Sequence, residues 1–98
     1  DNQAFEQVAM ALLRRYQSGN LGFFAITEKL LSLRYRAKKL NPETAAFLLW
    51  LDDEMSLITE GFAEAETAMQ KLYDFLAAIA ARHEEGQGGL SRLTLLHP

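Results

Sequence analysis

The chain of 98 residues contains no cysteine and only two prolines and two histidines. Without cysteine there can be no disulfide scaffold, no thiolate metal site and no cysteine nucleophile. No apolar run reaches the roughly 18 residues that a membrane-spanning helix needs, so we expect no membrane association and a soluble, cytoplasmic protein. Because residue 1 is Asp and not Met, a periplasmic or secreted location after removal of a signal peptide stays open.

Signatures of catalysis and of ligand binding are also missing. His83 lacks the second histidine, or the Glu three residues before it, that a metal site on a helix requires, since Ala80 stands there. The carboxylates between Asp52 and Glu66 have no catalytic partner in a recognisable cleft, so a solvated helix face explains them better than acid–base chemistry. The glycines at 86–89 lack the lysine of a phosphate-binding loop. We therefore expect no enzyme, no cofactor and no metal.

The charge is unevenly distributed along the chain. The net charge is −3, yet residues 1–41 carry seven Lys and Arg against three Asp and Glu, whereas residues 42–98 carry three against ten. The simplest interpretation is that the two parts pack beside one another, within one chain or between chains. A domain with a pI of about 5.3 meets a phosphate backbone with net repulsion, which makes nucleic acid an unfavoured partner.

Apolar residues recur at helical spacing along the chain, and no segment alternates with the period of two that a strand requires. The spacing predicts a helix over residues 2–16 that ends at Gly19. It predicts a second helix over residues 21–39, with Asn20 as its N-cap. An Asn-Pro-Glu start signal at Asn41 then opens a third helical stretch. The predicted fold class is therefore all-α.

The third stretch, residues 41–85, carries an a/d heptad pattern. Its a/d positions are Leu48, Leu51, Met55, Ile58, Phe62, Ala65, Met69, Leu72, Leu76 and Ile79. The pattern crosses Gly61 without a phase shift, which favours one continuous helix. Such a helix would be about 65 Å long at 1.5 Å per residue. The alternative is a kink or a short turn at residues 59–61.

A continuous long helix has a consequence for assembly. Two shorter helices of the same chain would leave part of its apolar seam uncovered, and exposed seams of that size mark interfaces. We therefore expect two short helices packed on one long helix in a coiled-coil-like homodimer. Its partner or dimer interface would consist of Phe62, Met69, Leu72, Leu76 and Ile79. With a turn at Gly61, four helices could instead close an up-down bundle as a monomer.

Residues 86–98 differ in character from the rest. Gly86, Gly88 and Gly89 are expected to end the long helix and to form a link, and the leucine-rich segment after them is too apolar for an inert tail. The chain is thus divided into one helical domain, residues 1–85, and a C-terminal tail that packs back on the domain or on a partner.

The end of the second helix is the best candidate for a ligand contact. It carries four cations, which are Arg34, Arg36, Lys38 and Lys39. Their simplest role is to stabilise a helix C-terminus and to pair with the next helix. The functional interpretation is contact with an acidic protein partner or another anion. Three aromatics near helix starts, Phe23, Phe24 and Trp50, are expected in the core, but any exposed one becomes a candidate interface anchor.

The combined pattern predicts a function in protein binding. We predict a non-enzymatic protein-binding module, such as an adaptor, a chaperone or a regulatory factor, that offers a hydrophobic seam or groove to an amphipathic helix. Two alternatives stay open. One is an inhibitor or immunity-type protein that presents an acidic helix to a basic partner. The other is a nucleic-acid-associated factor that uses the basic end of the second helix.

Overall fold

The computed structural model describes residues 2–36 and 39–96, and these residues form four α-helices and no strand. Side chains are described for residues 2–35 and 39–83. The four helices are α1 (Asn2–Gln17), α2 (Phe23–Arg36), α3 (Pro42–Thr59) and α4 (Ala65–Leu96). The prediction of an all-α fold is confirmed. None of these helices is both long and apolar enough to cross a membrane.

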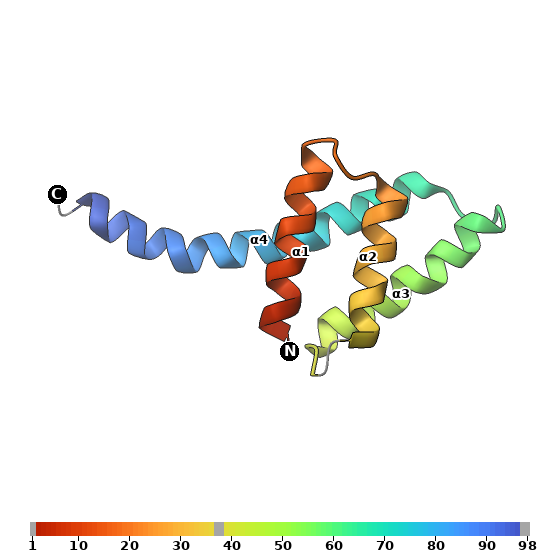
Figure 1. The fold of residues 1–98 in the computed structure, drawn as a ribbon, viewed down its shortest axis with the longest axis horizontal. Coiled ribbons are helices and arrows are strands. Elements are labelled where there is room, and N and C mark those ends of the chain that lie inside the picture. The colour runs from red at the N-terminus through yellow and green to blue at the C-terminus, as the bar shows by residue number, and fades with distance from the viewer. Residues whose placement is uncertain (1, 37–38, 97–98) are drawn as a thin grey trace.

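The helices form two hairpins that lie against each other (Figure 1). Helices α1 and α2 run side by side in opposite directions, and α3 and α4 lie behind them in this view. Every helix contacts the next one along the chain, and α4 returns to pack on α1. The last part of α4 continues past the other three helices. The core therefore lies between the two hairpins.

One hydrophobic core holds the hairpins together. Its fully buried aliphatic side chains come from all four helices and include Ala9, Ile26, Leu30, Leu48, Leu51, Ala68, Leu72 and Leu76. At its edge Phe47 of α3 stacks on Phe75 of α4, with ring centroids 4.0 Å apart. The Lys71 ammonium of α4 lies 4.8 Å from the ring centre of Trp50 on α3, a cation–π contact. These contacts hold α4 against α3.

Gly61 ends α3, so residues 41–85 form two helices and not the continuous helix that the heptad pattern favoured. The backbone of Gly61 is left-handed, with φ +84°. Its amide donates to the Ile58 carbonyl, and the Phe62 amide donates to the Leu57 carbonyl at 2.8 Å. This pair of hydrogen bonds is a Schellman motif, which satisfies carbonyls that a helix end leaves without partners. The chain then reverses into α4.

The heptad pattern fails locally around this turn. Ala68 is fully buried, whereas two residues that the pattern placed in the seam, Phe62 and Met69, are 78% and 36% exposed. From Leu72 onward the buried positions agree with the pattern again. Both α3 and α4 bury one face against the same core, so a continuous spacing does not require a continuous helix.

Local signals explain the other helix ends. Gly19 ends α1 in the left-handed conformation, as predicted, with φ +81°. Helix α2 begins after Gly22 rather than after Asn20; its described part runs to Arg36, and Lys39 is no longer helical. Asn41 occupies the N-cap position of α3, although its side chain makes no capping hydrogen bond.

The glycines near the C-terminus do not end α4. The helix continues through Gly86, Gly88 and Gly89 to Leu96. The prediction that the helix ends at Gly86 is therefore wrong. The predicted packing of the tail concerns side chains that lie outside the described part of the structure.

The substitution Gly61→Ala tests the turn, because a turn and a continuous helix predict opposite signs for the change in the free energy of unfolding. A Cβ atom in the left-handed conformation costs about 1 kcal/mol, so Gly61→Ala should lower the free energy of unfolding in urea titrations by about that amount. No atom lies within 4 Å of the added Cβ, so the loss reports backbone conformation and not a clash.

In a continuous helix the same substitution would raise the free energy of unfolding by about 1 kcal/mol, the opposite sign. Gly61→Asn is the matched control, because asparagine is the residue other than glycine that occupies this left-handed position most readily. It should lose less stability than Gly61→Ala.

Candidate functional site

The structure separates the five residues that the sequence placed in an interface seam. Leu72, Leu76 and Ile79 are buried in the core of the single chain. They are therefore core residues that hold α4 to the rest of the fold, and they offer no surface to a partner. Phe62 lies in the exposed turn before α4, and Met69 lies on the exposed side of α4. The five residues thus do not form one surface.

One of the four cations at the basic end of α2, Arg34, is engaged within the chain. Arg34 pairs with Asp52 of α3 at 3.3 Å. It also donates to the Tyr35 hydroxyl at 2.9 Å, and its guanidinium lies 4.7 Å from the centre of that ring. The Arg34–Asp52 pair agrees with the simpler of the two predicted roles, which is pairing with the next helix. Lys39 is exposed, and the predicted cations whose side chains lie outside the described residues are Arg36 and Lys38.

A partly buried charge cluster joins the start of α1 to α4. The Glu6 carboxylate accepts hydrogen bonds from Arg82 and from His83 Nε2, both at 2.9 Å, and from Asn2 at 3.2 Å. Burial by itself raises the pKa of Glu6, but the hydrogen bonds from His83 and Arg82 and the Arg82 charge outweigh it, so the pKa is lowered below 4.5. The cluster connects the start of α1 to α4.

Sequence reasoning missed this role of His83 because its partner Glu6 lies 77 positions away in the chain. No local spacing links the two residues, and only the return of α4 onto α1 brings them together. Among the side chains that the structure describes, no group of three or more His, Cys, Asp or Glu is placed to hold a metal ion.

The Glu6 cluster predicts a pH dependence of stability. Because the pKa of Glu6 is lower in the folded chain, its ionised form stabilises the fold above about pH 4.5, and this is lost as the pH falls through the folded pKa. In urea titrations the advantage of wild type over Glu6→Gln should shrink between about pH 5 and about pH 3. An advantage that stays constant over this range would contradict the assignment. Glu64→Gln, which removes an exposed carboxylate, is the control.

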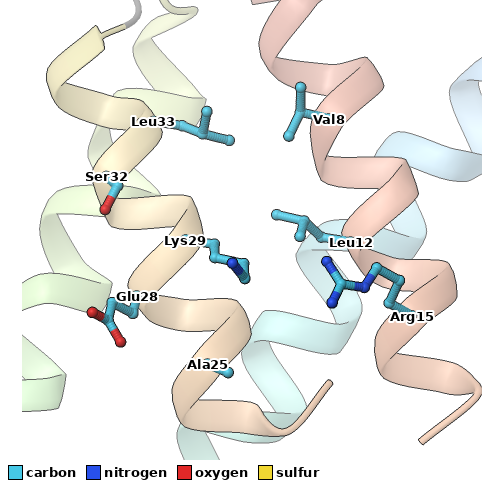
Figure 2. Close-up of a pocket in the computed structure, with 8 residues that line it drawn as sticks. All are labelled: Val8, Leu12, Arg15, Ala25, Glu28, Lys29, Ser32 and Leu33. Atoms are coloured by element: carbon cyan, nitrogen blue, oxygen red, sulfur yellow. The ribbon is translucent and has the colours of Figure 1, made fainter. Parts of the chain in front are cut away.

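Two grooves flank the exposed face of α2. The aromatic groove, between α2 and α3, has a volume of about 290 Å³ and is lined by Phe24, Thr27, Glu28, Leu31, Ser32, Tyr35 and Met55. The basic groove, between α1 and α2, has a volume of about 570 Å³ and is lined by Val8, Leu12, Arg15, Ala25, Glu28, Lys29, Ser32 and Leu33 (Figure 2). Glu28 and Ser32 form the ridge between them.

Two exposed aromatic rings stand at the ends of the aromatic groove. Phe24 is 58% exposed and Tyr35 is 76% exposed. They are eleven positions apart in α2, which corresponds to about 16 Å along the helix axis. The half-buried side chains of Leu31 and Met55 lie between them. Exposed aromatics on an apolar surface are typical of binding sites. Because Phe24 is exposed, it stays a candidate interface anchor.

The aromatic groove also contains a polar group that the fold leaves without a partner. Thr27 is only 1% exposed, and its hydroxyl has no hydrogen-bond partner among the described residues. A buried hydroxyl without a partner costs about 1–3 kcal/mol. The hydroxyl oxygen has almost no accessible surface, so this cost falls on the fold itself, and the oxygen does not face a ligand in the groove.

The basic groove combines two cations with apolar walls. Arg15 and Lys29 extend toward each other across it, whereas Glu28 points away from α1 (Figure 2). Within the described part of the chain, neither cation forms an ion pair. Val8 and Leu33 face each other at the other end of the groove. The groove therefore fits an occupant with both an apolar and an anionic part.

Sequence reasoning did not find the basic groove, although a signal exists. Val8, Leu12 and Arg15 follow one face of α1, and Ala25, Lys29 and Leu33 follow one face of α2. Helical spacing identifies each face separately. It does not say that the two faces meet, because that depends on how the helices pair.

Comparison with known proteins assigns no family to this chain. No protein-family model matches it, and no curated protein or solved structure matches it either. Function therefore has to be inferred from the surface of this chain.

Replacing Thr27 with valine tests whether its hydroxyl serves the fold. Valine keeps the shape and removes the unpartnered group, so Thr27→Val should raise the free energy of unfolding by about 1 kcal/mol, measured by urea denaturation. Thr59→Val is the control, because its hydroxyl donates to the Met55 carbonyl at 2.9 Å and its loss should bring no gain. A destabilised Thr27→Val would show that the hydroxyl has a structural partner after all.

Proposed function

We propose that the protein is a non-enzymatic protein-binding module that receives an amphipathic helix of a partner in the aromatic groove. One observation carries this proposal. Two exposed aromatic rings, Phe24 and Tyr35, stand at the ends of a largely apolar groove, with Leu31 and Met55 between them. An adaptor, a chaperone or a regulatory factor would each use such a surface.

The dimensions of the groove favour a helical ligand. A length of about 16 Å corresponds to about three helical turns. A helix that lies in such a groove presents apolar side chains at positions i, i+3 or i+4, and i+7, which is the usual pattern of helix-in-groove recognition. The flexible side chain of Met55 can adapt to different anchor residues. A surface this small supports binding with dissociation constants on the order of micromolar.

The function proposed here is protein binding, as the sequence predicts. The binding surface, however, is the aromatic groove on α2 and not the predicted seam. The seam residues Leu72 and Leu76 are buried in the core, whereas the aromatic groove on the exposed face of α2 is open to a partner. Aromatic anchors then replace aliphatic a/d residues as the main contacts.

Selection of helical peptides from a display library tests this function, since the selection requires no identified partner. Peptides enriched on wild type should carry the i, i+3 or i+4, i+7 apolar pattern. They should bind Phe24→Ala/Tyr35→Ala at least about tenfold more weakly by fluorescence anisotropy, because truncating aromatic anchors typically costs more than 1 kcal/mol. Both residues are exposed, so circular dichroism should show an unchanged fold.

Leu49→Ala is the matched control. Leu49 is 57% exposed and lies on α3 outside both grooves, so its loss removes a similar apolar surface without touching the proposed site. Peptides that bind the double variant as tightly as wild type would refute the proposal. So would chemical-shift changes that map away from the aromatic groove.

A further inference from the structure

The turn between α3 and α4 carries an exposed aromatic ring within an acidic segment. Phe62 is 78% exposed, which is the largest value among the large hydrophobic side chains that the structure describes. Glu60, Glu64 and Glu66 flank it in sequence, and all three are exposed. In a Schellman motif the residue after the left-handed glycine usually packs against the preceding helix, but Phe62 stays in solvent. We call these four residues the acidic knob.

The basic groove has the complementary features. Its two cations, Arg15 and Lys29, face each other without ion pairs in the described part of the chain, and Val8, Leu12 and Leu33 provide apolar contact. Its volume of about 570 Å³ lies in the range of ligand-binding pockets. Most of its lining side chains are exposed, so it would cover a small molecule on one side only. This favours a macromolecular occupant.

We propose that the occupant is the acidic knob of a second copy of this chain. Phe62 of one copy would lie between the apolar walls of the basic groove of the other, and its flanking glutamates would pair with Arg15 and Lys29. The turn that carries the knob lies at the edge of the molecule, away from the basic groove between α1 and α2 (Figure 1), so a chain does not fill its own groove. Each copy offers one knob and one groove.

This contact also accounts for the uneven charge of the chain. The basic groove belongs to the basic residues 1–41, and the knob belongs to the acidic residues 42–98. Because knob and groove are different surfaces of one chain, two copies can exchange both contacts in an isologous pair, or successive copies can form a heterologous head-to-tail series. The inference does not rest on the proposed function, because the aromatic groove lies on the other side of α2 and stays open.

Complementing variants provide the test. Phe62→Ser removes the knob, and Arg15→Glu/Lys29→Glu inverts the charge of the groove. All three side chains are exposed, so both variants should fold. In sedimentation velocity the mass of wild type should rise with protein concentration, and each variant should associate at least about tenfold more weakly. An equimolar mixture of the two variants should form a one-to-one complex, because each contributes one intact surface.

Two controls should behave like wild type. Arg14→Glu inverts a neighbouring exposed cation outside the groove, and Leu49→Ser removes an exposed apolar side chain elsewhere. Added salt should weaken the association, since it depends on charge pairs at a solvent-exposed surface. A wild type that stays monomeric up to millimolar concentration overturns the proposal. Association that survives both variants, or a mixture that does not restore it, does so as well.

Discussion

The fold depends on the left-handed turn at Gly61. At φ +84° the chain closes the hydrogen bonds of α3 and reverses, so that α4 returns to pack on α1. Every long-range contact of α4 follows from that reversal. The stacking of Phe47 on Phe75 and the engagement of Glu6 by Arg82 and His83 both require it. A continuous helix would instead carry α4 away and leave the core faces of α1 and α2 in water.

The sequence predicted those features that depend on neighbouring residues. Helical spacing identified the all-α fold, Gly19 ended α1, and Asn41 preceded α3 as expected. Neighbouring residues did not reveal whether the helix ends at Gly61. Two helices that bury one face against a shared core can keep a common 3.5-residue spacing across a turn. The left-handed backbone of Gly61, the exposure of Phe62 and the burial of Ala68 separate the two cases, and all three are properties of the folded chain.

The candidate sites were less predictable for the same reason. Each groove is made by two helices, and spacing within one helix does not say which partner it meets. The chemistry of the α2 surface arises from this pairing. Against α3 the helix presents exposed aromatic rings beside the unpartnered hydroxyl of Thr27, and against α1 it presents Lys29 toward Arg15. The exposed face of α2 thus separates an apolar groove from a charged one, and Glu28 and Ser32 form the border that both grooves share.

The reversal at Gly61 can be measured directly, because a chain without cysteine accepts a pair of spin labels without background. Suitable positions are Ala46 and Asp74, which are exposed neighbours of the stacked Phe47 and Phe75. Dilution with unlabelled protein restricts the electron–electron distance to one chain. The hairpin predicts a distance well under about 30 Å, whereas a continuous helix would separate the two positions by about 42 Å. A distance near the longer value would contradict the fold and both proposals that rest on it.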